Sequence, residues 1–72
     1  MNKMSMPVAE LCGHLIHETQ KHEKRGEQAP YESWYKQLRK KGVHKDLLRT
    51  PADNLELIQI LEGVKKEYYI HG

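Results

Sequence analysis

The sequence predicts an all-α fold, a small bundle of three principal helices plus one short helix. Two observations carry this prediction: apolar residues recur every three to four positions, and proline and glycine separate the segments in which they do so. No segment reads as a β-strand. With 72 residues, we expect positions 1–72 to form a single small domain, with 1–5 flexible and 70–72 frayed.

The segment 50–69 is expected to be the central helix. Thr50 suits the N-cap, Pro51 the first helical position and Asp53 the positive end of the helix. One broad apolar face is predicted to join the core, and it consists of Leu57, Ile60, Leu61, Val64 and Tyr68. A second, narrower apolar face holds Leu55, Ile58 and Tyr69, which we take as a candidate protein interface.

The first helix is expected to begin at a cap on Ser5 and to stop at Gly26. Its apolar stripe consists of Val8, Leu11, Cys12, Leu15, Ile16 and Thr19. Cys12 lies at the centre of that stripe, which favours a small core residue over a reactive thiol. As the single cysteine, it excludes a disulfide within the chain and fits a reducing compartment.

The second helix is expected to open at Pro30 and to end in three cations before Gly42. Tyr31, Trp34, Tyr35 and Leu38 form its apolar face. Residues 43–49 are expected to add one or two helical turns with Val43, Leu47 and Leu48 turned inward, and Pro51 limits that short helix.

Positive charge is concentrated in residues 36–49, although the net charge of the chain is only +2. The candidate nucleic-acid contacts are Lys36, Arg39, Lys40, Lys41, Lys45 and Arg49, against the single acid Asp46. The order helix, Gly42-Val43, short helix resembles the turn of a helix-turn-helix, but Leu38 stands where a small residue is usual and Pro51 shortens the second helix. The alternative interpretation is that these cations cap a helix end and keep the protein in solution.

Five histidines raise the question of a metal site, and HETQKH resembles the zinc-protease motif with one residue too many. His17 and His22 are separated by about 140° around a helix, so they do not face one metal ion. His14 and Glu18 share a face, but two ligands do not complete a tetrahedral site. Glycine-rich phosphate loops and nucleophile arrangements are not evident, so we expect no enzymatic activity, cofactor or small-molecule substrate.

Two classes of function remain. In the first, this is a small regulatory or adaptor protein that binds another protein or itself as a homodimer, of the kind that bacteria and their mobile elements encode. In the second, the basic segment contacts DNA or RNA. The start of the sequence lacks the apolar region of a signal peptide and no run is long enough to span a membrane, so a cytoplasmic location is expected.

Overall fold

The computed structural model describes residues 7–69 and confirms the all-α prediction. The elements are α1 (Val8–Arg25), α2 (Tyr31–Lys40), the single 3₁₀ turn η1 (Lys45–Leu47) and α3 (Asn54–Tyr69), and none of the described residues is in a strand. The Ser5 cap and the predictions for residues 1–5 and 70–72 lie outside the described residues.

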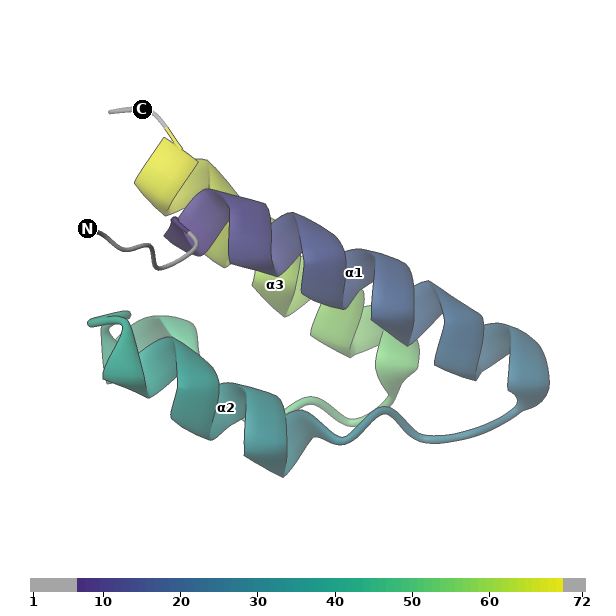
Figure 1. Cartoon of the computed structure of the whole chain (residues 1–72). Helices are drawn as coiled ribbons and strands as arrows, with labels where there is room; N and C mark the ends of the chain where they lie inside the picture. The colour runs from purple at the N-terminus through teal and green to yellow at the C-terminus, as the bar shows by residue number, and fades with distance from the viewer. Residues whose placement is uncertain (1–6, 70–72) are drawn as a thin grey trace.

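The long helices α1 and α3 pack side by side and run in opposite directions, and α2 lies on one side of this pair (Figure 1). The chain leaves α1 at one end of the molecule, returns along α2, turns through η1 and crosses back before α3 begins. The opposite side of the α1–α3 pair is covered by no other described element. The bundle therefore has a covered side, where α2 and η1 lie, and an open side.

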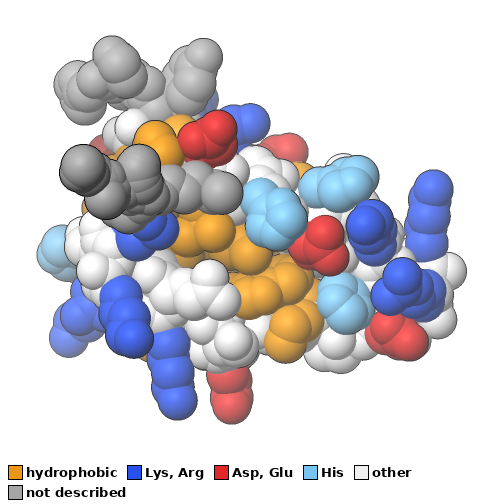
Figure 2. Space-filling view, viewed as in Figure 1, with side chains coloured by type: hydrophobic (Ala, Val, Ile, Leu, Met, Phe, Trp, Pro, Cys, Tyr) orange, Lys and Arg blue, Asp and Glu red, His pale blue; other side chains and the backbone are white. Residues whose placement is uncertain are grey.

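The core lies between the three helices and contains most residues of the predicted apolar faces, while Tyr68 of the broad α3 face is only partly buried and packs against it, as do Val8, Tyr31 and Tyr35. On α3, Leu57, Leu61 and Val64 are completely or almost completely buried and Ile60 is buried, as predicted. Leu11, Cys12, Leu15, Ile16 and Thr19 are buried on α1, and the Thr19 hydroxyl donates to the Leu15 carbonyl oxygen at 2.8 Å. Trp34 and Leu38 contribute from α2. Figure 2 shows the edge of the core as hydrophobic side chains between α1 and α2, beside histidine and acidic side chains.

Two glycines end helices as predicted, because each adopts a positive φ that other residues disfavour. Gly26 has φ of 72°, and the amide of Glu27 donates to the His22 carbonyl oxygen at 2.9 Å. Gly42 has φ of 93°, and the Val43 amide donates to the Leu38 carbonyl oxygen at 3.1 Å. Both Val43 and Leu38 are fully buried, so this turn is fixed by packing as well as by hydrogen bonds.

The predicted start of the last helix at Thr50 and Pro51 is wrong, since α3 begins at Asn54. Asp53 acts as the N-cap instead, and its carboxylate accepts the Glu56 amide at 2.9 Å. In return the Glu56 carboxylate accepts the Ala52 amide at 2.6 Å. This reciprocal arrangement is close to a capping box, and it gives partners to the Ala52 and Glu56 amides at the start of α3.

The predicted short helix over residues 43–49 is reduced to η1, a turn of three residues. Val43 and Leu48 are buried as expected, and Leu47 is partly buried. The Tyr31 hydroxyl donates toward the carbonyl oxygens of Leu48 and Arg49 at 2.9 and 3.0 Å, which holds this segment out of a helix. The segment between Gly42 and Pro51 therefore has no recognition helix, and the resemblance to a helix-turn-helix is not realised.

Asn54 is a buried polar residue whose role the sequence analysis did not identify. Its Nδ2 donates to the Glu27 carbonyl oxygen at 2.7 Å and to Glu23 Oε1 at 3.0 Å, while its Oδ1 accepts the Ala29 amide at 3.0 Å. The three bonds tie the start of α3 to the end of α1 and to the loop before α2. A buried amide is stabilising only when its donors and its acceptor are paired, and here the side-chain NH2 group and the carbonyl oxygen of Asn54 both have partners.

Candidate functional site

The open side of the α1–α3 pair carries two hollows that follow one another along the line between the helices. The larger, of about 400 Å³, is lined by His17, Gln20, Lys21, Glu23 and Lys24 of α1 and by Leu55 and Ile58 of α3. The second, of about 340 Å³, is lined by Gly13 and Ile16 of α1 and by Glu62, Lys65 and Lys66 of α3. Neither hollow includes a residue of α2 or η1. We call the two together the seam groove.

Two of the three predicted interface residues lie in the seam groove. Leu55 is 59% exposed, and among the described residues it is the one large hydrophobic side chain that is exposed. Ile58 is half-buried and packs against the core from the floor of the same hollow. The side chain of Tyr69 lies outside what the structure describes. The structure therefore brings Leu55 and Ile58 together beside α1, while η1 and the aromatic face of α2 lie elsewhere.

A glycine inside α1 deepens the groove, and the sequence analysis did not single it out. Gly13 has no side chain to fill the space beside α3, and the Lys65 Nζ lies 3.8 Å from the position that a Cβ would occupy. Glycine in a helix interior costs about 1 kcal/mol relative to alanine. The backbone conformation does not require a glycine, since only Gly26 and Gly42 have positive φ among the described residues. The signal available in the sequence was a glycine in the middle of an otherwise regular helical pattern.

The rim of the seam groove is positively charged. Among residues 7–69, Lys24, Lys65 and Lys66 form no ion pair, whereas Lys21 lies 3.7 Å from Glu18 on its own helix. The lining also holds the carboxylates of Glu23 and Glu62. Glu23 accepts a hydrogen bond from the uncharged Asn54 amide and keeps its charge, so with the Lys21–Glu18 pair set aside three ammonium groups face two carboxylates. These three lysines belong to α1 and α3, and none of them lies in the basic segment 36–49.

Beneath the groove, Cys12 is completely buried. Burial raises the pKa of its thiol to about 11, although the nearby Lys65 ammonium acts in the opposite direction. The residue is therefore a protonated thiol at neutral pH, in agreement with its prediction as a core residue.

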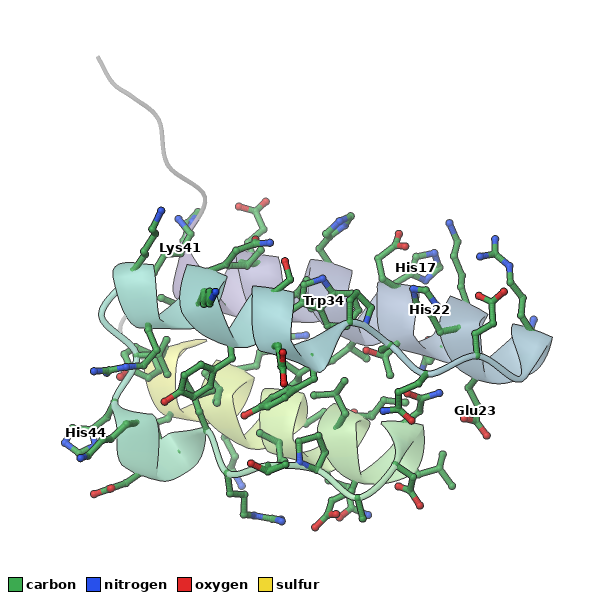
Figure 3. The ribbon with its side chains drawn as sticks, turned by 90° about the horizontal axis from the view of Figure 1, so that it is seen from below. His17, His22, Glu23, Trp34, Lys41 and His44 are labelled. Atoms are coloured by element: carbon green, nitrogen blue, oxygen red, sulfur yellow. The ribbon has the colours of Figure 1, made fainter. Side chains whose placement is uncertain are left out.

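The basic segment 36–49 divides into arginines that bond within the fold and lysines that project from it. Arg39 donates to the Val43 carbonyl oxygen at 2.8 Å, and Arg49 pairs with Glu56. Within the described residues, no ion pair or side-chain hydrogen bond involves the four lysines, which are Lys36, Lys40, Lys41 and Lys45. Lys41 and His44 lie at one end of the bundle, while His17, His22 and Glu23 lie toward the other (Figure 3).

An aromatic hollow of about 310 Å³ lies beside this segment, lined by Tyr31, Glu32, Tyr35, Lys36, Leu48 and Thr50. The rings of Tyr31 and Tyr35 are 5.9 Å apart between centroids and tilted by 52°. Burial raises the pKa of the Tyr31 hydroxyl, and the neighbouring Tyr35 acts in the same direction. Both rings line the hollow, and the Tyr31 ring is held in place by the bonds of its hydroxyl to the backbone.

The four histidines that the structure describes do not converge on a metal position. Among residues 7–69, no three side chains of histidine, cysteine, aspartate or glutamate lie close enough to hold an ion. His22 packs edge-on against Trp34, with ring centroids 6.2 Å apart, and its Nδ1 lies 3.3 Å from a Glu27 carboxylate oxygen without hydrogen-bond geometry. His17 instead lines the seam groove from the exposed face of α1.

Comparison with protein-family models, with curated proteins and with solved structures finds no match to this chain. In the part of the chain that the structure describes, no helix is both long enough and apolar enough to cross a membrane.

Proposed function

We propose that this protein is a small non-enzymatic regulator or adaptor that acts by binding another protein through the seam groove. The observation that carries the proposal is the exposure of Leu55 next to the half-buried Ile58, in a hollow built only from α1 and α3. An apolar side chain at the mouth of a groove is an anchor of the kind around which protein interfaces form. In a domain of this size, a bound partner also stabilises the folded state.

Photo-crosslinking in the native host tests this proposal. A photoreactive amino acid at Leu55 is expected to capture a protein, and the same residue at Gln37, on the exposed face of α2, is the matched control. Capture should disappear when Ile58 is changed to Glu in a chain that circular dichroism shows to be folded. Equal capture from both positions, or none from Leu55, contradicts the proposal.

The second candidate function is binding of DNA or RNA by the basic segment. It is favoured by the free ammonium groups of Lys40, Lys41 and Lys45 around one turn, with the Tyr35 ring beside Lys36. Such a surface neutralises phosphates and offers a ring for base stacking. The alternative is that these lysines only cap the end of a helix and keep the protein in solution.

Changing Lys40, Lys41 and Lys45 to Gln should leave the fold intact, because none of the three contributes to the core. Under the nucleic-acid hypothesis, the parent retards DNA or RNA in a gel at low salt and the triple variant does not. A triple Gln variant of Lys24, Lys65 and Lys66 in the seam groove is the matched control and should bind as the parent does. A parent that shows no shift at low salt ends this hypothesis.

A further inference from the structure

We infer that the occupant of the seam groove is an acidic amphipathic helix of another protein, and not a second copy of this chain. The inference rests on the proposed function and names the chemistry of its partner. It depends on three features of the groove, which are its shape, its apolar floor and the charge of its rim.

The shape of the groove suits one helix. Its lining runs on α1 from Gly13 to Lys24 and on α3 from Lys66 to Leu55, and the two helices are antiparallel. At the rise of an α-helix this is roughly 16 Å, or about three turns. A helix laid along this line completes the packing around the α1–α3 pair, with α2 on one side and the partner on the other. Gly13 permits close approach at one end of the groove, since it presents no side chain there.

The floor sets the apolar pattern of the partner. Leu55 and Ile58 are one turn apart on α3, and Ile16 is the apolar lining residue of the second hollow. A helix that contacts these residues needs apolar side chains at intervals of three and four, repeated over its three turns. Its remaining faces point to the rim or to solvent.

The rim sets the charge of the partner. Lys24, Lys65 and Lys66 stand around the floor without ion pairs among the described residues, and they outnumber the two carboxylates of the lining, Glu23 and Glu62. Carboxylates flanking the apolar stripe of a bound helix can pair with these ammonium groups at the edge of an interface from which water is partly excluded. Complementary charge at an interface raises the rate of association and selects among partners.

The same charges disfavour a second copy. In a two-fold dimer each groove meets an identical groove. Such a dimer brings together three free ammonium groups from each copy, and the Glu23 and Glu62 carboxylates of each copy offset them only in part. Like charges brought together across an interface reduce affinity, so the unpaired lysines argue for an occupant of opposite charge.

Peptide binding tests the inference with the full chain. Two labelled peptides of about 18 residues share one apolar stripe, and the flanking positions are glutamate in one peptide and lysine in the other. The acidic peptide is expected to bind at least tenfold more tightly by fluorescence anisotropy at low salt. The amide resonances of Gly13, Leu55 and Ile58 should shift, and those of Gln37 should not.

Charge exchange gives the decisive control. Changing Lys24, Lys65 and Lys66 to Glu should reverse the preference between the two peptides. Leu55→Glu should weaken the binding of both peptides without loss of fold, because Leu55 is exposed.

Equal binding of both peptides, or tighter binding of the basic one, overturns the inference and leaves the proposed function standing if Leu55 still captures a protein. A dimer in sedimentation equilibrium that Leu55→Glu dissociates shows that a second copy fills the groove, and also overturns it. Binding to phosphatidylglycerol vesicles that Leu55→Glu abolishes, with neither peptide bound, overturns it in favour of a membrane surface. If Leu55 captures no protein and neither peptide binds, the proposed function fails as well.

Discussion

The covered and open sides of the α1–α3 pair use similar residue types for different purposes. On the covered side, leucine is buried, both arginines of the segment 36–49 bond within the fold while its four lysines project from it, and glycine occupies turns with positive φ. On the open side, Leu55 is exposed, three lysines have no ion pair among residues 7–69, and Gly13 lies in the middle of a regular helix. On the covered side, folding therefore explains the buried leucines, the bonded arginines and the turn glycines, whereas it does not explain an exposed Leu55 in a hollow between two helices. Matched substitutions on the two sides test this distinction.

The largest contrast is expected between two leucines of α3. Leu61→Ala on the covered side should lower the free energy of unfolding by about 2–5 kcal/mol, because Leu61 is almost fully buried and its removal leaves a cavity. Leu55→Ala on the open side should change it by no more than about 0.5 kcal/mol. Urea unfolding of the two variants measures both values. A similar loss in both variants means that Leu55 supports the fold and is not reserved for a partner.

The next contrast concerns side-chain amides. Asn54→Asp replaces two donated hydrogen bonds with a carboxylate that faces the Glu27 carbonyl oxygen and the Glu23 carboxylate. Leaving buried polar groups unpaired costs about 1–3 kcal/mol, and repulsion from Glu23 adds to this. Gln20→Glu, in the lining of the seam groove, is the control and should stay within about 0.5 kcal/mol of the parent. Thermal unfolding of the two variants at neutral pH separates these outcomes, and equal midpoints contradict the assignment of Asn54 as a structural link.

The sequence predicted the covered side well because periodicity reports burial directly. The α3 face with Leu57, Leu61 and Val64 and the turns at Gly26 and Gly42 follow from local rules that tertiary contacts reinforce. The start of α3 was misplaced because Thr50-Pro51 and Asp53 are both good starts locally. The choice between them depends on the hydrogen bonds of Glu56 with Ala52 and Arg49, which form only in the folded chain.

The open side was predicted only in part. Leu55 and Ile58 were visible as a second apolar face, but their neighbours on α1 depend on how the two helices pack. The charge pattern along the chain indicates residues 36–49 as the basic surface, but both arginines of that segment bond within the fold. The lysines of the seam groove come from segments that are acidic overall, so only the fold brings them together.

Glycines give a smaller contrast of opposite sign. Gly42→Ala on the covered side forces a side chain into a backbone conformation with φ of 93°, which should cost about 1–2 kcal/mol. Gly13→Ala on the open side should instead stabilise the protein by up to about 1 kcal/mol, since the added methyl group meets only Lys65 Nζ at an ordinary contact distance. The same Gly13→Ala variant should bind the acidic peptide more weakly. Destabilisation by Gly13→Ala indicates instead that the glycine is needed for the packing of α1 on α3.

The smallest contrast is one of pH dependence between two glutamates of α3. The Ala52 amide and the Arg49 guanidinium hold the pKa of Glu56 below its usual value of 4.5. A carboxyl whose pKa is lower in the folded state binds fewer protons there than in the unfolded state, so it stabilises the fold above its unfolded pKa. That stabilisation is lost as the pH falls through the folded pKa.

Glu56→Gln should therefore be less stable than the parent at neutral pH, and the gap should narrow as the pH falls below about 4.5. Glu62→Gln, in the seam groove, makes the same chemical change where the described residues offer the carboxylate no ion pair, and its gap should be close to zero at both pH values. Urea unfolding at neutral and acid pH gives the four differences. A gap for Glu56→Gln that stays constant with pH shows that the carboxylate acts through packing and not through its charge. A pH-dependent gap for Glu62→Gln shows that the groove carboxylate already has a partner within the fold, and removes the distinction between charges that hold the bundle together and charges left for another molecule.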